Sequence, residues 1–432
     1  MSMDQHLEQR IHQAFLAQRA AYFKYPVPSY DERIADLNHL AQFLREQQQA
    51  ICEVINQDFG NRSFHETMLS EILPSLNEIA HVKKHLKSWM KPQRRGVDLK
   101  SFFGAKNRVM AQPLGVVGVI VPWNFPLFLS LGPLINIFGA GNRAMIKMSE
   151  NSRHLTRLLS EQLGKYFPPE KLCFIDGEEG AGQAFSKQPF DHLIFTGSGQ
   201  TGSAVMAAAA QNLCPVTLEL GGKSPAIVLD DFDLKTAVER IMYAKCLNAG
   251  QICVTVDHVY VPAHKMDAFV QMARDVVQKR YSGKDSTDYT AIIDAKSFAR
   301  LTHALDEAKA AGARVMPLFD GETFDAATRK ITPQLVLDAP NDIELMTREI
   351  FGPILPIIAY TELSQVVDDI NARPRPLAFY PFTHDEKQLD YLLKYIISGG
   401  VSVNDTLLHV VQTDMPFGGV GASGMGHYHG YE

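Results

Sequence analysis

Apolar residues are spaced in two different ways along this chain of 432 residues. In the first hundred residues they recur every three or four positions, as Ile34, Leu37, Ala41 and Leu44 do, which is the spacing of one buried helix face. From residue 116 onward, short continuous apolar runs alternate with helical stretches. Such runs are typical of strands that are covered on both faces. The pattern predicts a helical start, over 5–60 and 63–91, followed by alternating strands and helices.

The first alternating stretch predicts a parallel sheet with helices on both faces. The expected strands are 116–121, 144–147, 172–175, 192–195 and 216–220, and the expected helices are 127–138, 154–166, a short one from about 180, and 201–211. Crossovers between parallel strands are right-handed, so the fold class is α/β with a doubly wound, dinucleotide-type sheet. A ligand of such a sheet lies at the carboxyl ends of the strands.

A second α/β unit begins after Gly221-Gly222. Its expected strands are 226–229, 259–261, 355–359, 377–382 and 401–404, and its helices start near 234, 263, 297 and 363, with a last one ending at 397. No flexible linker separates the units, so we expect an extensive interface with the functional cleft in it. We assign 1–96 and 114–220 to a cofactor-binding domain and 221–402 to a catalytic domain.

Residues 97–112 follow neither pattern, because Val97, Leu99 and Phe103 surround Gly104 in a short, alternating stretch. This predicts a hairpin that stands off the main body. Hairpins of this kind often pair with another subunit. We therefore group 97–113 with the C-terminal 403–432 as oligomerisation or bridging segments.

Composition excludes several classes of protein. Hydrophobic residues make up 46% of the chain and charged residues 21%, as in ordinary globular proteins. The formal net charge of -6 argues against nucleic-acid binding. Five cysteines, an odd number without framework spacing, indicate a reducing compartment. The polar N-terminus, Met1 to His6, does not have the pattern of a signal peptide.

No charged residue occurs between Val109 and Arg143, and such a run could be taken for a membrane span. Pro122, Pro126 and Pro133 interrupt it, however. We interpret it as a buried strand, a turn and a buried helix, and expect a soluble cytoplasmic protein without membrane partners.

Cys253 is the leading candidate for a nucleophile. Asp233 can cap a helix with a buried face that carries Cys246, and Asn248 and Gly250 can end that helix, because both tolerate the left-handed conformation. Cys253 would then lie in a loop just past a helix end, where a ligand can reach it. The alternative is that it is a small buried hydrophobe, which is the more usual state of a free cysteine.

Two further motifs carry candidate chemistry. Gly197 to Gly202 fits G-x-G-x-x-G between a strand and a helix, which favours a bound pyrophosphate over a glycine turn that binds nothing. Glu219 lies about 20 positions on, where a simple Rossmann interpretation would place a ribose ligand. However, a carboxylate inside an apolar strand end is costly unless it is paired or has a catalytic role.

Together these stretches resemble the aldehyde dehydrogenase superfamily. The resemblance is carried by Pro122-Trp123-Asn124-Phe125-Pro126, Leu218-Glu219-Leu220-Gly221-Gly222-Lys223-Ser224-Pro225, Asn248-Ala249-Gly250-Gln251-x-Cys253, Glu349-Ile350-Phe351-Gly352-Pro353 and Pro416-Phe417-Gly418-Gly419. Asp58-Phe59-Gly60-x-Arg62-Ser63, Asp288 to Ile293 and Ser423 to Gly430 are most similar to the class 3-like branch, and within it to coniferyl aldehyde dehydrogenases.

The resemblance implies NAD(P)-dependent oxidation of an aldehyde to a carboxylic acid, through a thiohemiacetal and a thioester. Cys253 would be the nucleophile, Asn124 would hold the oxyanion, and Glu219 would be the general base. The implied cofactor contacts are Trp123, Lys147, Glu150, Gly197, Ser198, Gly202, Leu220, Glu349 and Phe351. Glu150 favours NAD, although Lys147 could accommodate NADP. No metal is expected, because the His427-x-His429 pair has no further ligands nearby.

The implied substrate is a bulky, aromatic aldehyde such as coniferyl aldehyde, and Phe128, Ile252 and Val254 are candidates for its pocket. A medium- or long-chain aliphatic aldehyde is the alternative. The chain departs from the family at Val256, where proline is common, and at Gly199, where threonine is frequent. It stops at Tyr431-Glu432, where relatives continue for several dozen residues, so we expect a shortened C-terminal arm and a weakened homodimer. A truncated nucleotide-binding fold of low activity is a third possibility.

Overall fold

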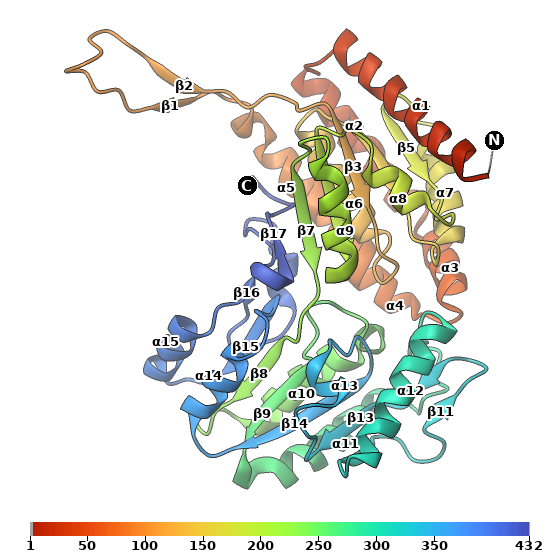
Figure 1. The fold of residues 1–432 in the computed structure, drawn as a ribbon, viewed down its shortest axis with the longest axis vertical. Coiled ribbons are helices and arrows are strands. Elements are labelled where there is room, and N and C mark those ends of the chain that lie inside the picture. Colours follow the sequence, from red (N-terminus) through yellow and green to blue (C-terminus); the bar gives the residue numbers. More distant parts are fainter. Residues whose placement is uncertain (1–2, 432) are drawn as a thin grey trace.

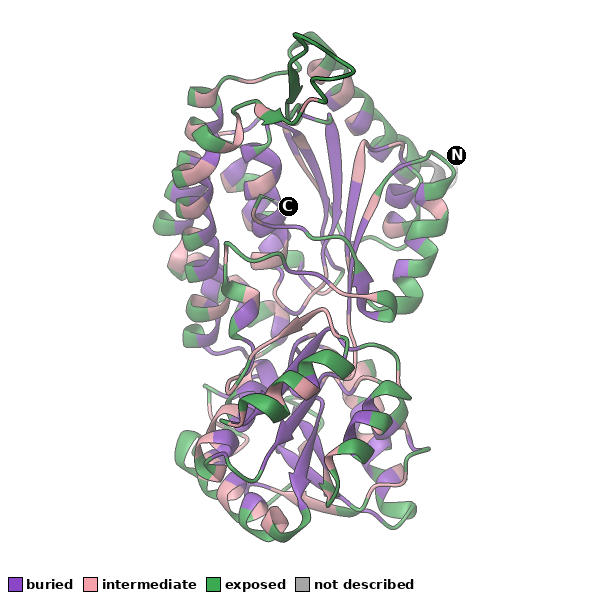
Figure 2. Cartoon of the chain, turned by 90° about the vertical axis from the view of Figure 1, so that its left-hand side faces the viewer, coloured by how far each residue is buried: buried purple, intermediate pink, exposed green. Residues whose placement is uncertain are grey.

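The computed structural model describes residues 3–431, and the remaining residues of the terminal segments considered above, 1–2 and 432, lie outside it. The chain forms two lobes, each built around its own sheet, and a long hairpin that projects from the upper lobe in Figure 1. Figure 2 shows that the strands and the inner faces of the helices are buried, whereas the outer helix faces are exposed. The predicted α/β class is therefore confirmed.

The first sheet has the strand order β17-β7-β6-β3-β4-β5. Its five parallel strands are β3 (Val116–Ile120), β4 (Arg143–Lys147), β5 (Leu172–Ile175), β6 (His192–Gly197) and β7 (Val216–Leu220), close to the expected positions. Because they are parallel, the chain after β3, β6 and β7 emerges at one edge. The sequence pattern does not predict β17 (Gly424–Met425), which pairs antiparallel with β7 and sets Gly424 opposite Glu219.

Helices cover both faces of this sheet, as expected of a doubly wound fold. They are α1 (Met3–Lys24), α2 (Tyr30–Glu46), α3 (Gln48–Phe59), α4 (Phe64–Thr67), α5 (Leu73–Trp89), α6 (Phe128–Gly139), α7 (Arg153–Leu163), α8 (Ala181–Ser186) and α9 (Gly199–Ala210). A π-helical turn, Met68–Ile72, joins α4 to α5. The uncharged run considered above forms β3, a turn and α6, and no helix among residues 3–431 is long and apolar enough to cross a bilayer.

The second sheet has the order β10-β13-β14-β9-β8-β15-β16. Its strands are β8 (Pro225–Val228), β9 (His258–Pro262), β10 (Arg314–Pro317), β13 (Gln334–Leu337), β14 (Ile354–Tyr360), β15 (Ala378–Phe382) and β16 (Gly400–Val401). Its helices are α10 (Leu234–Cys246), α11 (Met266–Arg280), α12 (Ala295–Ala310), α13 (Glu344–Thr347), α14 (Leu363–Asn371) and α15 (Glu386–Tyr395). The sequence pattern missed β10, β13 and the small hairpin of β11 (Phe324–Asp325) and β12 (Lys330–Ile331).

The projecting hairpin begins earlier than the sequence pattern indicates. Its paired strands are β1 (Gln93–Arg95) and β2 (Asn107–Val109), so the first strand precedes the expected start at residue 97. Gln93-Arg94-Arg95 is polar and shows no alternation, which is why the pattern does not reveal it. The tip between the strands exposes Phe102 and Phe103.

Candidate active site

One cleft of about 990 Å³ lies where the two sheets meet. The sequence-predicted residues in its lining are Trp123, Asn124, Gly197, Ser198, Glu219, Leu220, Cys253, Glu349 and Phe351. They come from the ends of β3, β6 and β7 in one lobe and from two loops of the other. The fold therefore brings all three predicted catalytic residues to one cleft.

Three predicted cofactor contacts are not in this lining. Lys147 ends β4, and its Nζ lies 2.6 Å from Oε1 of Glu150, so these two residues form an ion pair. Gly202 lies inside α9, where a Cβ atom would collide with Leu220. Its place in the motif therefore serves the packing of helix against strand, as the third glycine of such a motif often does.

The loop that presents Cys253 follows α10, which Asp233 caps by accepting a 2.8 Å hydrogen bond from the amide of Thr236. The backbone then turns through left-handed φ values of 51°, 50° and 71° at Asn248, Ala249 and Gly250. Asn248 and Gly250 tolerate this conformation, as the sequence predicts, but Ala249 adopts it as well. Residue Cys253 is partly exposed, whereas Cys246 is buried in the core.

Asn124 is joined directly to this loop. Its Nδ2 donates to the carbonyl oxygen of Gln251 over 3.2 Å, and Asn248 Nδ2 donates to the carbonyl oxygen of Asn124, also over 3.2 Å. Arg62 adds a 2.9 Å hydrogen bond from NH1 to the same oxygen of Asn124. The buried amide of Asn124 is thus held next to the segment that carries the thiol.

Burial and acidic neighbours dominate the electrostatics of the cleft. Burial, reinforced by Glu349 and Glu219, raises the pKa of Cys253 to about 12, so the thiol is protonated at neutral pH. Burial also raises the pKa of Glu219 well above its usual range, and neither carboxyl oxygen has a hydrogen-bond partner among residues 3–431. Unpartnered buried oxygens of this kind are available to a substrate or to water.

The lining also fits a dinucleotide. Ser198 caps α9 by accepting from the amide of Thr201, and a Cβ atom on Gly199 would meet no other atom, so the helix N-terminus is open to an anion. Glu349, which also lines the cleft, carries a buried oxygen without a hydrogen-bond partner in the described part of the chain. Burial and then the charge of Asp257 raise the pKa of Glu349 to about 8. An anion-accepting turn and a free carboxyl acceptor suit a pyrophosphate and a ribose.

Comparison with known proteins agrees with this geometry. The model of the aldehyde dehydrogenase family matches residues 2–432. The chain belongs to this family. It is 51% identical over 419 residues to a probable coniferyl aldehyde dehydrogenase of Pseudomonas aeruginosa, a match that covers 97% of this chain and 87% of that one. It is 44% identical to the coniferyl aldehyde dehydrogenase of a Pseudomonas species, over 92% of this chain and 83% of that one.

Solved structures show the same fold. The substrate-bound AldH of Staphylococcus aureus superposes with a TM-score of 0.92 at 35% identity, over 98% of this chain and 91% of that one. The aldehyde dehydrogenase of Mycobacterium tuberculosis complexed with NAD+ superposes with a TM-score of 0.88 at 27% identity, and the match covers 98% of this chain and 88% of that one. These comparisons confirm the predicted family and its fold. They also confirm that the chain is an oxidoreductase that acts on aldehydes and uses a nicotinamide dinucleotide cofactor.

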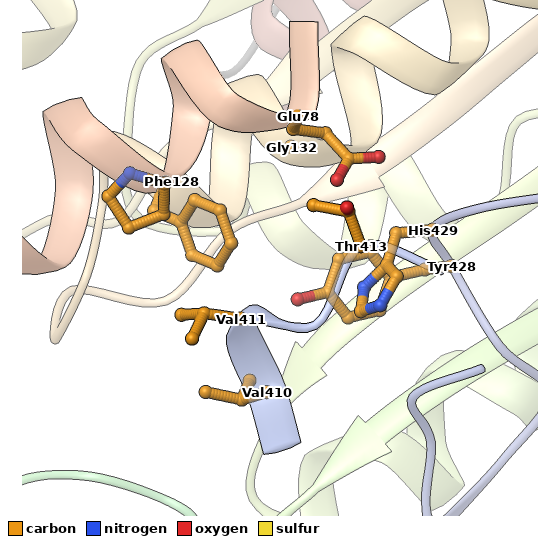
Figure 3. Close-up of a pocket in the computed structure, with 9 residues that line it drawn as sticks. Glu78, Phe128, Gly132, Val410, Val411, Thr413, Tyr428 and His429 are labelled. Carbon is orange, nitrogen blue, oxygen red and sulfur yellow. The ribbon is translucent and has the colours of Figure 1, made fainter. Parts of the chain in front are cut away.

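A second, much smaller cavity of about 10 Å³ has Tyr428 in its lining. Figure 3 shows the ring of Phe128 on one side of it and Tyr428, His429 and Thr413 on the other, with Glu78 above. Burial raises the pKa of Tyr428 well above its usual range, and the charges of Glu219 and Cys253 add to this effect. Tyr428 therefore lines the small cavity and lies within electrostatic reach of two residues of the catalytic cleft.

Of the three apolar residues predicted for a substrate pocket, Phe128 lines this small cavity. Ile252 and Val254 are not in the lining of either cavity, and with exposed fractions of 5% and 2% they pack in the main core. Flanking the nucleophile along the chain does not place a side chain in its pocket. Among the described residues, no group of three histidine, cysteine, aspartate or glutamate side chains could hold a metal ion.

Sequence reasoning missed the cationic side of the large cleft. Five cationic residues line this side of the cleft: Lys223, Arg300, Arg348, Arg373 and Arg375. Lys223 lies inside the Gly221-Gly222-Lys223-Ser224 motif, which is a signal in the sequence that could have identified it. The arginines lie on or beside helices of the second lobe, where the sequence pattern does not distinguish them from ordinary solvated side chains.

Proposed function

We propose that this protein oxidises an aromatic aldehyde to its carboxylic acid, with Cys253 as the nucleophile and NAD as the preferred electron acceptor. The observation that supports this most directly is the meeting of Cys253, Asn124 and Glu219 in the lining of one dinucleotide-sized cleft. Each residue type matches one requirement of the reaction: a nucleophile, an oxyanion donor and a base.

In the first half of the reaction, the Cys253 thiol passes its proton to water in the cleft, and its Sγ bonds to the carbonyl carbon. The electron pair of the C=O bond moves to oxygen, which accepts hydrogen bonds from Asn124 Nδ2 and from the backbone N–H of Cys253. The nicotinamide supplies the two-electron acceptor for the hydride of this carbon. The acyl group is then held on Cys253 as a thioester.

In the second half, Glu219 accepts a proton from water, and the hydroxyl oxygen adds to the thioester carbon. The carbon–sulfur bond breaks, the carboxylic acid leaves, and the sulfur of Cys253 regains a proton. An acyl transfer to coenzyme A would not require this base, so Glu219 supports hydrolysis. Its unpartnered oxygens leave room for the water that it would activate.

Several residues would hold the cofactor. Gly197 and Ser198 at the start of α9 would receive the pyrophosphate, and Glu349 and Phe351 would contact the nicotinamide riboside, with Trp123 and Leu220 beside it. The Glu150 carboxylate would accept from the adenosine ribose, and its negative charge supports NAD over NADP. Lys147 already pairs with that carboxylate, so it offers less positive charge to a 2′-phosphate.

Coniferyl aldehyde is the aromatic substrate that we propose, on the strength of relatives at 51% and 44% identity with that name. Phe128, Val410, Val411 and Tyr428 around the small cavity suit an aromatic ring. A cavity of about 10 Å³ holds one water and no ring, so Tyr428 or Phe128 must move to admit the substrate.

The test is NADH formation, followed by absorbance with coniferyl aldehyde, benzaldehyde and a series of aliphatic aldehydes. Cys253→Ala should abolish the first-turnover burst, whereas Glu219→Gln should retain the burst and lose steady turnover. A kcat/KM that is higher for long aliphatic aldehydes than for coniferyl aldehyde would overturn the proposal of an aromatic substrate. NADH binding without oxidation of any aldehyde would indicate a nucleotide-binding fold instead.

We also propose that the protein is a homodimer and that it is located in the cytoplasm. The hairpin of β1 and β2 exposes Leu99, Phe102 and Phe103, which supports a homodimer in which this tip is covered. All five cysteines are free, which suits the reducing cytoplasm.

A further inference from the structure

The segment 345–351 begins inside α13, runs toward β14, and carries two residues that face the large cleft, Glu349 and Phe351. Phe351 has a φ of 50°, a left-handed conformation that is rare for a bulky side chain. Such a conformation persists where the surroundings over-determine it. The segment has little regular structure of its own, so what holds it must come from its neighbours.

Its backbone oxygens are held by cationic side chains from three different places in the fold. Lys223 Nζ donates to the carbonyl oxygens of Leu345, at 2.7 Å, and of Arg348, at 3.1 Å. Arg373 and Arg300 donate to the carbonyl oxygens of Met346 and Ile350, each at 2.5 Å. Charged donors make hydrogen bonds roughly twice as strong as neutral ones.

Asp257 completes this arrangement from the other side. Its Oδ2 accepts a 2.9 Å hydrogen bond from the amide of Ile350, the residue between Glu349 and Phe351. Its Oδ1 pairs with Lys223, and the side chains of Asp257 and Lys223 are 1% and 9% exposed. One buried carboxylate thus connects the lysine that holds the start of the segment to the amide at its end.

The held segment in turn contacts the junction between the lobes and the first lobe itself. A Cβ atom on Gly221 would collide with the Glu349 carboxylate, and the backbone of Gly222 offsets part of the rise in the pKa of Glu349. Phe351 packs edge-on against Trp123, with ring centroids 5.4 Å apart. Both contacts lie at the cofactor end of the cleft, next to Asn124. A shift of the segment would therefore move Glu349 and Phe351 relative to Cys253.

We propose that Asp257, together with Lys223, is a positioning residue that fixes Glu349 and Phe351 in the geometry that the nicotinamide riboside needs. Asp257 touches neither substrate nor cofactor and acts through the backbone of Ile350. The inference rests on the proposed function, since it concerns the cofactor contacts of that site. Displacement of about 1 Å at such contacts can slow a reaction about 10²-fold.

The experiment compares the full chain with Asp257→Ala and Asp257→Asn. NADH affinity is measured by its fluorescence, and the first-turnover rate by stopped flow with coniferyl aldehyde and saturating NAD. Asp257→Ala should weaken NADH binding at least tenfold and slow the first turnover about 10²-fold. Asp257→Asn keeps an acceptor for the Ile350 amide and loses the charge beside Lys223, so it should recover part of both losses.

A third readout separates positioning from general damage. Alkylation of Cys253 by iodoacetamide, located by peptide mass spectrometry, needs the thiol but no nicotinamide, so Asp257→Ala should leave its rate within about twofold. Asp320→Ala removes the exposed pair with Arg274 and is the matched control. A folded Asp257→Ala with unchanged NADH affinity and first turnover overturns the inference. Should that variant not fold, an Asp257→Asn identical to the unsubstituted protein overturns it.

Failure of the proposed function can be distinguished from failure of this inference. The proposed function is wrong if the unsubstituted protein oxidises no aldehyde. The NADH titration still compares the variants in that case, because it requires binding and no turnover.

Discussion

The side-chain amide of Asn248 donates to the main-chain oxygen of Asn124 over 3.2 Å, across 124 positions of sequence. The same Nδ2 donates to the carbonyl oxygen of Gln251 over 3.1 Å. Asn248 therefore connects the proposed oxyanion donor on one lobe to the thiol-bearing loop on the other. Its left-handed backbone, with a φ of 51°, restricts what can replace it.

We predict that Asn248→Asp slows the first turnover 10²- to 10³-fold. Aspartate keeps the size of asparagine and tolerates the left-handed conformation, but it cannot donate to either carbonyl oxygen. The oxyanion donor would keep only its own hydrogen bond to the carbonyl oxygen of Gln251, and would lose the bridge that Asn248 makes between Asn124 and this loop. Stopped-flow NADH formation checks this. Asn371→Asp, which removes an exposed donor to the carbonyl oxygen of Tyr395, is the control, and equal rates in both variants would contradict the prediction.

A buried ion pair supports the turn that carries Asn124. Arg62 NH1 lies 2.9 Å from Glu71 Oε1, and both side chains are 0% exposed. Glu71 Oε2 accepts from the amides of Leu127, at 2.7 Å, and Phe128, at 3.1 Å, at the start of α6. Glu71 lies in the π-helical turn, and the pair brackets the segment that carries Asn124.

Removing one member of this pair should destabilise the fold strongly. Arg62→Met leaves the Glu71 carboxylate buried without its charge partner, so we predict a loss of about 3–5 kcal/mol in the free energy of unfolding. Urea denaturation measures it. Arg314→Met breaks the pair with Asp338, in which both side chains are 62% exposed, and should cost less than about 1 kcal/mol. Similar losses for the two variants would show that burial of the first pair has little effect.

Part of the site could be predicted from local patterns. The periodicity of 234–246 and the residues Asn248 and Gly250 place Cys253 in a loop. The roles of Asn124 and Glu219 came from the resemblance to the aldehyde dehydrogenase family, and the pairing of the parallel strands brings both to one sheet edge.

The rest depends on long-range contacts that leave no periodic pattern. β17 has two residues, and its pairing with β7 becomes visible only when the C-terminal segment is placed beside Glu219. Arg300 and Arg373 look like solvated residues in the sequence, yet both donate to one backbone segment. Ile252 and Val254 flank the nucleophile and still face the core. For these residues, tertiary packing decides the role.

The pH dependence of stability should reveal the buried carboxyl of Glu349. Burial and then Asp257 raise its pKa from 4.5 to about 8 in the folded state. Between these values the folded chain holds a proton that the unfolded chain has lost, so this group's contribution to stability is lost as the pH rises. Glu349→Gln cannot ionise. Its stability relative to the unsubstituted protein should therefore increase by up to about 1.4 kcal/mol per pH unit in this window.

Urea denaturation of both proteins at pH 5, 6, 7 and 8 gives this difference. Glu362→Gln, at an exposed position outside the cleft, controls for the substitution itself. A difference between Glu349→Gln and the unsubstituted protein that stays constant over the four pH values would mean that the carboxyl ionises in the folded state as readily as in the unfolded one.

The last prediction concerns the hairpin. Phe103 is 98% exposed and Phe102 is 64% exposed at its tip, and burying a phenylalanine side chain is worth about 1.5–3 kcal/mol. If a second subunit covers the tip, Phe102→Ser/Phe103→Ser removes about 3–6 kcal/mol from each protomer's share of the interface. Light scattering over a concentration series should then show the dimer dissociating at concentrations at least 10²-fold higher than before. Phe23→Ser on α1, at a side chain that is 68% exposed, should leave the mass unchanged. An unsubstituted chain that is monomeric throughout the series, or a double variant that dimerises as before, would show that the tip makes no subunit contact.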